Sequence, residues 1–165
     1  MRLYFAGPLF TQAERAWNRA VAADLVARGH AVFLPQDEVQ EPAALDADVI
    51  FALDIRGVRA AEAVVAILDG ADPDSGTSFE CGLAFALGIP IIAVRTDFRG
   101  GGDALPGQKL PSINLMLSQA ATRVLHLADS ALGPAVVAEA IGRALDELRP
   151  AEIRADVPGP VAGDP

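Results

Sequence analysis

Five short apolar runs alternate with segments of helical periodicity along the chain, and this alternation limits the folds open to it. The third run, A-V-V-A-I-L, has no polar alternation, which is typical of a strand covered on both faces. A strand followed by a helix five times in succession predicts a parallel sheet between two layers of helices. The predicted strands are 2–6, 31–35, 63–68, 91–95 and 123–127. We therefore expect an α/β fold: a five-stranded doubly wound parallel sheet in three α/β/α layers, flavodoxin-like or Rossmann-like.

Helix-start and helix-stop signals lie between the runs. Thr11 and Glu14 form a T-x-x-E capping box, and the helix that they open ends before Gly29. Periodicity and stop signals predict further helices at 46–60, 77–87 and 134–148, and a short one beginning near Ser112.

Two segments lack such periodicity. Residues 96–111 are rich in Gly and Pro and predict a long loop, which in a compact domain is often functional. Residues 150–165 predict a disordered tail, so residues 1–149 are interpreted as a single domain.

Charge and composition exclude several classes of function. A net charge of −9 disfavours binding to a nucleic-acid backbone, and no stretch approaches the roughly 20 apolar residues of a membrane span. One cysteine, Cys81, permits no internal disulfide, and the N-terminus lacks the features of a signal peptide. We expect a cytoplasmic protein with no nucleic-acid or membrane partner. No residues have the spacing of metal ligands, so we expect no metal and no cofactor.

The stretch D-P-D-S-G-T-S-F-E-C-G at 72–82 carries two acids of interest, Asp74 and Glu80. In the simpler interpretation, Asp74 stabilises a turn, and Glu80 completes a capping box with Thr77. Alternatively, Glu80 lies in the first turn of the helix, where the helix dipole keeps its carboxylate ionised. A carboxylate nucleophile with a second carboxyl group for proton transfer suits glycosyl transfer through a covalent intermediate.

Three other polar residues also allow two interpretations. Tyr4, at the end of the first strand, is either a core residue or a hydrogen-bond donor to Glu80. Asp54 lies within the 46–60 helix, either exposed or in the site, and Asn114 either caps a short helix or contacts substrate. Cys81 is interpreted as a packing residue.

Three motifs together resemble the nucleoside 2-deoxyribosyltransferase family: Y-F-A-G-P-L-F at 4–10, the 72–82 stretch and N-L-M at 114–116. The resemblance covers roughly residues 2–127. It implies that Glu80 is the nucleophile that attacks C1′ of a 2′-deoxyribose. Asp74 would then shuttle the proton of the base, and Tyr4 would orient the nucleophile.

The resemblance also implies residues that bind substrate. Asp54 would hold sugar hydroxyls, Gly7 would lie in the substrate pocket, and the Gln36 amide would contact the base. Asn114 and Met116 would come from a neighbouring subunit, which implies a homo-oligomer built from dimers, such as a hexamer. The substrates would be 2′-deoxynucleosides and free nucleobases, exchanged with retention of configuration in nucleoside salvage, with slow hydrolysis when no acceptor base is present.

Two alternatives remain open at this stage. The first is a 2′-deoxynucleoside 5′-monophosphate N-glycosidase, for which Arg95, Arg99 and Lys109 are candidate phosphate ligands. The second is a non-catalytic nucleotide-binding module that holds an anion at the helix N-terminus after Gly76.

Overall fold

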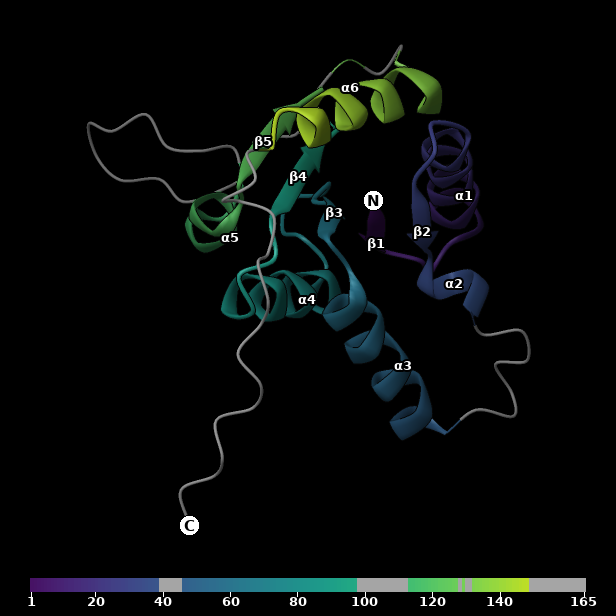
Figure 1. Ribbon diagram of the computed structural model, residues 1–165, viewed down its shortest axis with the longest axis vertical. Helices are drawn as coiled ribbons and strands as arrows, with labels where there is room; N and C mark the ends of the chain where they lie inside the picture. Colours follow the sequence, from purple (N-terminus) through teal and green to yellow (C-terminus); the bar gives the residue numbers. More distant parts are fainter. Residues whose placement is uncertain (39–45, 98–112, 128, 130–131, 149–165) are drawn as a thin grey trace.

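The computed structural model describes residues 1–38, 46–97, 113–127, 129 and 132–148 (Figure 1). The elements are β1 (Arg2–Ala6), α1 (Gln12–Ala27), β2 (Ala31–Phe33), α2 (Pro35–Glu38), α3 (Ala47–Ala60), β3 (Ala63–Ile67), α4 (Ser75–Ala86), β4 (Ile91–Arg95), α5 (Leu115–Ala120), β5 (Arg123–His126) and α6 (Pro134–Asp146). The predicted fold class is confirmed, with five parallel strands between helical layers. Within the described ranges, no helix is long and apolar enough to cross a membrane.

The strands lie in the order β2-β1-β3-β4-β5. The chain leaves β1 towards one edge to form β2 and later returns to the other side of β1 to form β3, so the order reverses between these strands. The carboxyl ends of β1 and β3 lie side by side, with Ala6 paired to Ala66. Ligands of doubly wound sheets bind at such a reversal, beyond the carboxyl ends of the strands.

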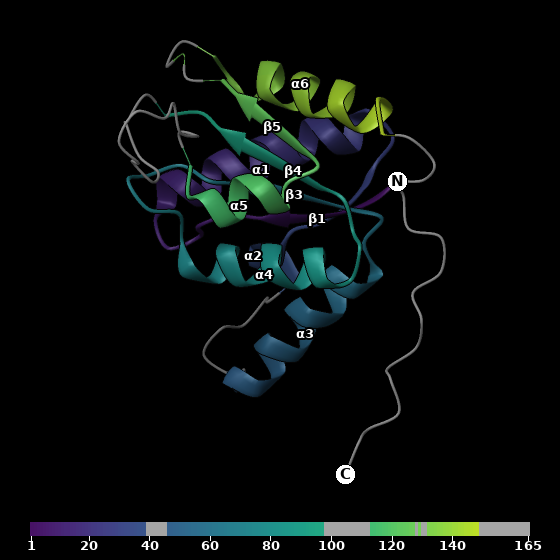
Figure 2. The same cartoon turned by 90° about the vertical axis from the view of Figure 1, so that its left-hand side faces the viewer.

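Helices lie on both sides of the sheet (Figure 2). Alternate residues of the strands face two separate hydrophobic cores. Leu3 and Phe5 of β1 face the core that α1 and α6 cover. Tyr4 and Ala6 face the opposite core, which α3, α4 and α5 cover. This alternation positions Tyr4 beneath α3 and α4, with none of its side chain exposed.

Several boundaries of the strands and helices differ from the predictions. The second strand ends at Phe33, and Pro35 begins the short helix α2, where the fixed φ of proline suits a first helical position. Helix α4 begins at Ser75 rather than at residue 77. Helix α6 ends at Asp146 rather than at residue 148. The loop predicted at 96–111 lies largely outside the described residues, as do Ser112 and the predicted tail.

Candidate active site

Glu80 and Tyr4 form the centre of the candidate site. The Tyr4 hydroxyl donates a hydrogen bond of 2.5 Å to Oε1 of Glu80, joining β1 to α4. Burial, followed by the charge of Glu80, raises the pKa of Tyr4 far above its usual value, so its hydroxyl stays protonated. Tyr4 is therefore a fixed donor, and it constrains one of the two carboxylate oxygens of Glu80.

The electrostatic environment of Glu80 favours its protonated form. The pKa of Glu80 is raised to about 7: burial is the largest cause, the Tyr4 hydrogen bond lowers the pKa, and the charges of Asp54 and Asp74 raise it. Asp54, on α3, also raises the pKa of Tyr4, and its own pKa is raised by burial. Residues from β1, α3 and the start of α4 thus act on one carboxyl group.

Asp74 is the N-cap of α4. Its Oδ2 accepts hydrogen bonds from the backbone N–H of Thr77 at 2.8 Å and from the Thr77 hydroxyl at 3.0 Å. The simpler interpretation, a capping box between Thr77 and Glu80, is therefore wrong, because Thr77 bonds with Asp74 and Glu80 bonds with Tyr4.

The start of α4 at Ser75 also moves Glu80 out of the first turn. Glu80 is the sixth residue of the helix, and no acidic residue lies in the first turn. The expectation that the helix dipole keeps Glu80 ionised is thus wrong, since that effect fades beyond the first turn. Burial dominates instead, and it shifts the pKa in the opposite direction.

Gly7 lies where β1 and β3 end together. A β-carbon at this position would stand 3.3 Å from Cβ of Ile67, closer than most such contacts. Glycine therefore permits the close approach of the loop after β1 to the end of β3. That loop is tied to α1, because the side-chain amide of Asn18 donates to the Pro8 carbonyl at 2.9 Å.

The Gln36 side chain packs against α1. It is 5% exposed, its amide nitrogen donates to the Arg15 carbonyl at 2.8 Å, and its oxygen accepts a hydrogen bond from Asn18 at 3.3 Å. The structure does not bring Gln36 into the group formed by Tyr4, Asp54, Asp74 and Glu80. Its hydrogen bonds attach α2 to α1.

Asn114 and Met116 lie at the start of α5, beside α4. The Asn114 side chain caps this helix by accepting from the Met116 N–H at 2.9 Å, and Met116 is 76% exposed. Both residues line a cavity of about 520 Å³ with Ser78, Gly82 and Phe85 of α4. Glu80 is not among the described residues of that cavity, since the spacing of α4 places it on another flank of the helix.

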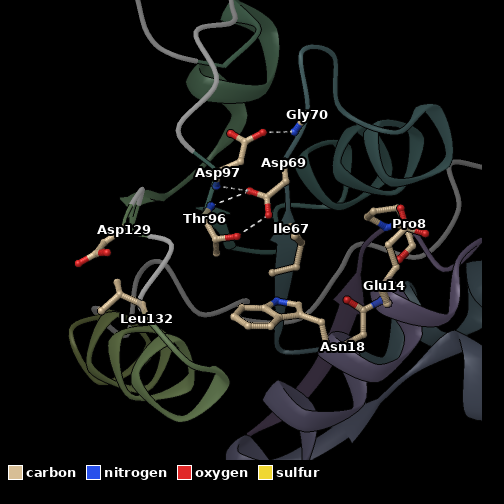
Figure 3. A pocket seen from close by; sticks show the side chains of 12 residues that line it. Pro8, Glu14, Asn18, Ile67, Asp69, Gly70, Thr96, Asp97, Asp129 and Leu132 are labelled. Atoms are coloured by element: carbon tan, nitrogen blue, oxygen red, sulfur yellow. Dashed lines mark hydrogen bonds between the residues drawn. The ribbon is translucent and has the colours of Figure 1, made fainter.

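A network of acidic residues, not predicted from the sequence, joins the loops after β3 and β4 (Figure 3). Asp69 accepts hydrogen bonds from the Thr96 N–H at 2.6 Å and from the Thr96 hydroxyl. Asp97 accepts from the Gly70 N–H at 2.7 Å and from Nε of Arg95 at 2.8 Å, and Arg95 also donates to the Gly70 carbonyl. The network holds the loop that leads to Asp74.

Arg95 is 2% exposed within this network, so its guanidinium is held by Asp97 and Gly70 inside the protein. Arg99 and Lys109, the other two cations considered for a phosphate, lie outside the described residues.

The same network borders a cavity of about 610 Å³ on the α1 and α6 side of the sheet (Figure 3). Its lining includes Pro8, Asn18 and Ile67, whereas Tyr4 and Glu80 are absent from its described lining. Among the described residues, no group of His, Cys, Asp or Glu side chains has an arrangement that could hold a metal ion. Cys81 is 1% exposed, and burial raises the pKa of its thiol to about 12, which fits a packing role.

A comparison with protein families identifies the family of this chain. The model of the family described as nucleoside 2-deoxyribosyltransferase matches residues 3–126, which span β1 to β5. The chain belongs to the nucleoside 2-deoxyribosyltransferase family. The matched region contains the Tyr4 and Glu80 pair and the Asp74 cap. A search of curated proteins finds no match.

Solved structures similar to this member of the nucleoside 2-deoxyribosyltransferase family support the assignment. A conserved protein from Enterococcus faecalis is 25% identical, with a TM-score of 0.66, over 87% of this chain and 98% of that one. A 2-desoxiribosyltransferase from Leishmania mexicana is 28% identical, with a TM-score of 0.60, over 84% and 97% of the two chains. A CMP N-glycosidase from Clostridium botulinum is 16% identical, with a TM-score of 0.55, over 87% and 99%, and shares the fold.

Proposed function

We propose that this protein is a nucleoside 2-deoxyribosyltransferase that exchanges the base of a 2′-deoxynucleoside through a deoxyribosyl ester on Glu80. The observation that carries the proposal is the buried Glu80 carboxyl group, bonded to the Tyr4 hydroxyl and within electrostatic range of Asp74. Two-step glycosyl transfer needs one carboxylate to attack the sugar and a second carboxyl group to handle the proton of the leaving group.

In the first step, Oε2 of Glu80 attacks C1′ as the bond from C1′ to the base nitrogen breaks. The base takes the bonding electron pair and receives a solvent proton relayed through Asp74. Tyr4 holds Oε1, so the attacking oxygen keeps its direction. Among the described residues, both hydrogen bonds accepted by the Asp74 side chain fall on Oδ2, which leaves Oδ1 to face the base.

In the second step, a nitrogen of another free base attacks C1′ and the ester bond to Glu80 breaks. The incoming nitrogen gives its proton to Asp74, and Glu80 returns to the carboxylate form. Two displacements on opposite faces retain the configuration at C1′, and the reaction follows ping-pong kinetics. Water acting in place of the base would hydrolyse the ester slowly.

Further residues complete the proposed site. Asp54, on α3, would accept hydrogen bonds from sugar hydroxyls, and Gly7 would let the sugar or the base lie close to the backbone. Gln36 is assigned the structural role of joining α2 to α1, because its amide is already bonded to Arg15 and Asn18.

Asn114 and Met116 would complete the site of a neighbouring subunit. In their own chain they line the flank of α4 that faces α5, and the side chain of Met116 is largely exposed. An exposed methionine next to an asparagine suits a contact with substrate across a subunit interface. The protein would therefore act as a homo-oligomer built from dimers, and a hexamer is one such assembly.

The charges near Glu80 favour a nucleoside over a nucleoside 5′-monophosphate. Asp54 and Asp74 are carboxylates, and Arg95 is held by Asp97 and Gly70. A 5′-phosphate would meet repulsion at this site. The similarity to the CMP N-glycosidase, at 16% identity, extends to the fold alone.

The structure also disfavours the non-catalytic nucleotide-binding module. Such a module would hold an anion at the N-terminus of α4, but the Asp74 carboxylate already accepts the Thr77 N–H there. A phosphate at the same end of the helix would compete with a fixed negative charge.

A base-exchange assay tests the proposal. The protein is incubated with 2′-deoxyinosine and adenine, and the products are separated by chromatography. We expect 2′-deoxyadenosine from the wild-type protein and from Glu139→Ala, an exposed position on α6. Glu80→Ala should lose more than roughly a hundredfold of the rate, because a covalent nucleophile contributes far more than that. Hypoxanthine and free sugar without 2′-deoxyadenosine would identify a hydrolase.

The donor itself separates the two enzymatic alternatives. With 2′-deoxyinosine and its 5′-monophosphate compared at equal concentration, we expect exchange from the nucleoside. Faster base release from the monophosphate would favour the N-glycosidase.

A further inference from the structure

Gly57 faces the ring of Tyr4 from α3. A β-carbon at position 57 would lie 2.9 Å from Cε2 of Tyr4 and 2.8 Å from Cε1 of Phe33. Both distances are shorter than side chains tolerate, so the rings would have to move. Glycine in the middle of a helix is less stable than alanine, so its presence in α3 calls for a packing reason.

Phe33, at the end of β2, forms the second wall around the Tyr4 ring. The two rings are stacked, with centroids 5.4 Å apart and an angle of 15° between their planes. Tyr4 is completely buried, so its ring cannot turn towards solvent. Gly57 and Phe33 together form what we call the ring slot, and the Tyr4 hydroxyl emerges from it to reach Glu80.

We propose that Gly57 is a positioning residue, whose missing side chain lets the ring of Tyr4 occupy the place from which its hydroxyl bonds to Glu80. The catalytic consequence rests on the proposed function, whereas the effect on Glu80 itself does not. Asp54 lies one turn before Gly57 on the same helix, so α3 contributes both a charged group and a packing surface to the site.

The ring slot therefore determines how easily Glu80 ionises. The groups that act on Glu80 are Tyr4 from β1, Asp54 from α3 and Asp74 at the start of α4, and the adjacent Cys81 thiol is itself affected by Glu80. Burial and the two carboxylates raise the pKa of Glu80, while the Tyr4 hydrogen bond lowers it. Displacing the Tyr4 ring would remove the lowering contribution and retain the raising ones.

The test measures Glu80 directly by a ¹³C NMR pH titration of glutamate side chains, with its signal assigned from Glu80→Gln. We expect Gly57→Ala to move the Glu80 midpoint upward by roughly one pH unit, as expected for a lost hydrogen bond to a charged group. Tyr4→Phe should give a similar displacement, and the double variant should move no further than Tyr4→Phe alone. The matched control is Gly142→Ala on α6, where the new β-carbon meets its nearest atom at 3.7 Å.

An unchanged Glu80 midpoint in folded Gly57→Ala would overturn the proposal, as would displacements that add fully in the double variant. If Gly57→Ala does not fold, Phe33→Leu decides, because it removes the other wall of the slot. An upward displacement in Phe33→Leu supports the slot, and an unchanged midpoint overturns it. The titration needs no substrate, so a wild-type protein without exchange activity would refute the proposed function and leave this result standing.

Discussion

The buried Glu80 carboxylate should destabilise the fold at neutral pH, and Glu80→Gln should relieve that cost. The surroundings of Glu80, chiefly its burial, raise its pKa from 4.5 to about 7. Because the pKa of Glu80 is higher in the folded state, the protonated side chain contributes fully to stability below pH 4.5. This contribution is lost as the pH rises through 7. At 1.36 kcal/mol per pH unit, the loss amounts to roughly 3 kcal/mol.

Glutamine is the appropriate replacement because it is neutral and similar in shape. Its carbonyl oxygen can still accept the hydrogen bond from Tyr4. The free energy of unfolding of Glu80→Gln should therefore be close to that of the wild-type protein at pH 4. At pH 9 the variant should exceed the wild type by roughly 3 kcal/mol.

Urea unfolding at a series of pH values, followed by circular dichroism at one protein concentration, measures this difference. Glu139→Gln is the matched control, since Glu139 is exposed and pairs with Arg143 on the surface of α6. Such surface pairs contribute less than about 1 kcal/mol, so the control should show little change with pH. A constant difference between Glu80→Gln and the wild type from pH 4 to 9 would refute the reasoning, because Glu80 would then ionise equally well in both states.

Three further predictions concern activity and the loops around the site. The kcat/KM of base exchange should rise with pH, with a midpoint near 7, because the nucleophile must be ionised in the free enzyme. A midpoint below about 5.5, measured by initial rates, would contradict this. Asp74→Ala should lose about 1 kcal/mol of unfolding free energy, because it removes the helix cap. Asp74→Asn should keep the cap but lose the base-exchange activity. Equal stability of the two variants in urea would argue against the cap. Arg95→Met should lower the unfolding free energy by roughly 3 kcal/mol, because it leaves Asp97 without its buried partner. The exposed control Arg143→Met should lower it by less than about 1 kcal/mol. Similar urea midpoints for the two variants would show that the Arg95–Asp97 pair contributes little.

The strands could be predicted from the sequence because each is a short apolar run, and 63–67 is buried along its whole length. The helix α2 could not, because its four residues, Pro35–Glu38, are too few to show apolar periodicity. The strand order could not be predicted from local patterns either, because the pairing of β1 with both β2 and β3 joins residues that are distant in the sequence.

The start of α4 shows how two valid local signals compete. Both D-x-x-T at 74–77 and T-x-x-E at 77–80 resemble helix N-termini, and the predicted helix began at the second. In the structure Asp74 is the N-cap of α4, and Glu80 instead accepts a hydrogen bond from Tyr4 of β1. That tertiary hydrogen bond cannot be identified from the spacing of residues within one helix.

The proximity of four candidate residues could be predicted from the sequence, whereas their electrostatics could not. The motifs contain Tyr4, Asp74 and Glu80, the family resemblance added Asp54, and the structure brings these four together. The prediction that Glu80 stays ionised was wrong, because burial raises its pKa and depends on how α3 and β1 pack around the side chain. A glycine within a predicted helix, as at Gly57, indicates a close approach of another group, and here that group is the Tyr4 ring.

The central claim is that Glu80 becomes covalently attached to the sugar. Mass spectrometry of the protein after brief incubation with 2′-deoxyinosine and no acceptor base, followed by acid quenching and digestion, tests it most directly. We predict a mass increase of one deoxyribosyl group on the peptide that contains Glu80, lost again when adenine is added before quenching. Base release from 2′-deoxyinosine with no labelled peptide, or a label on a residue other than Glu80, would contradict the account.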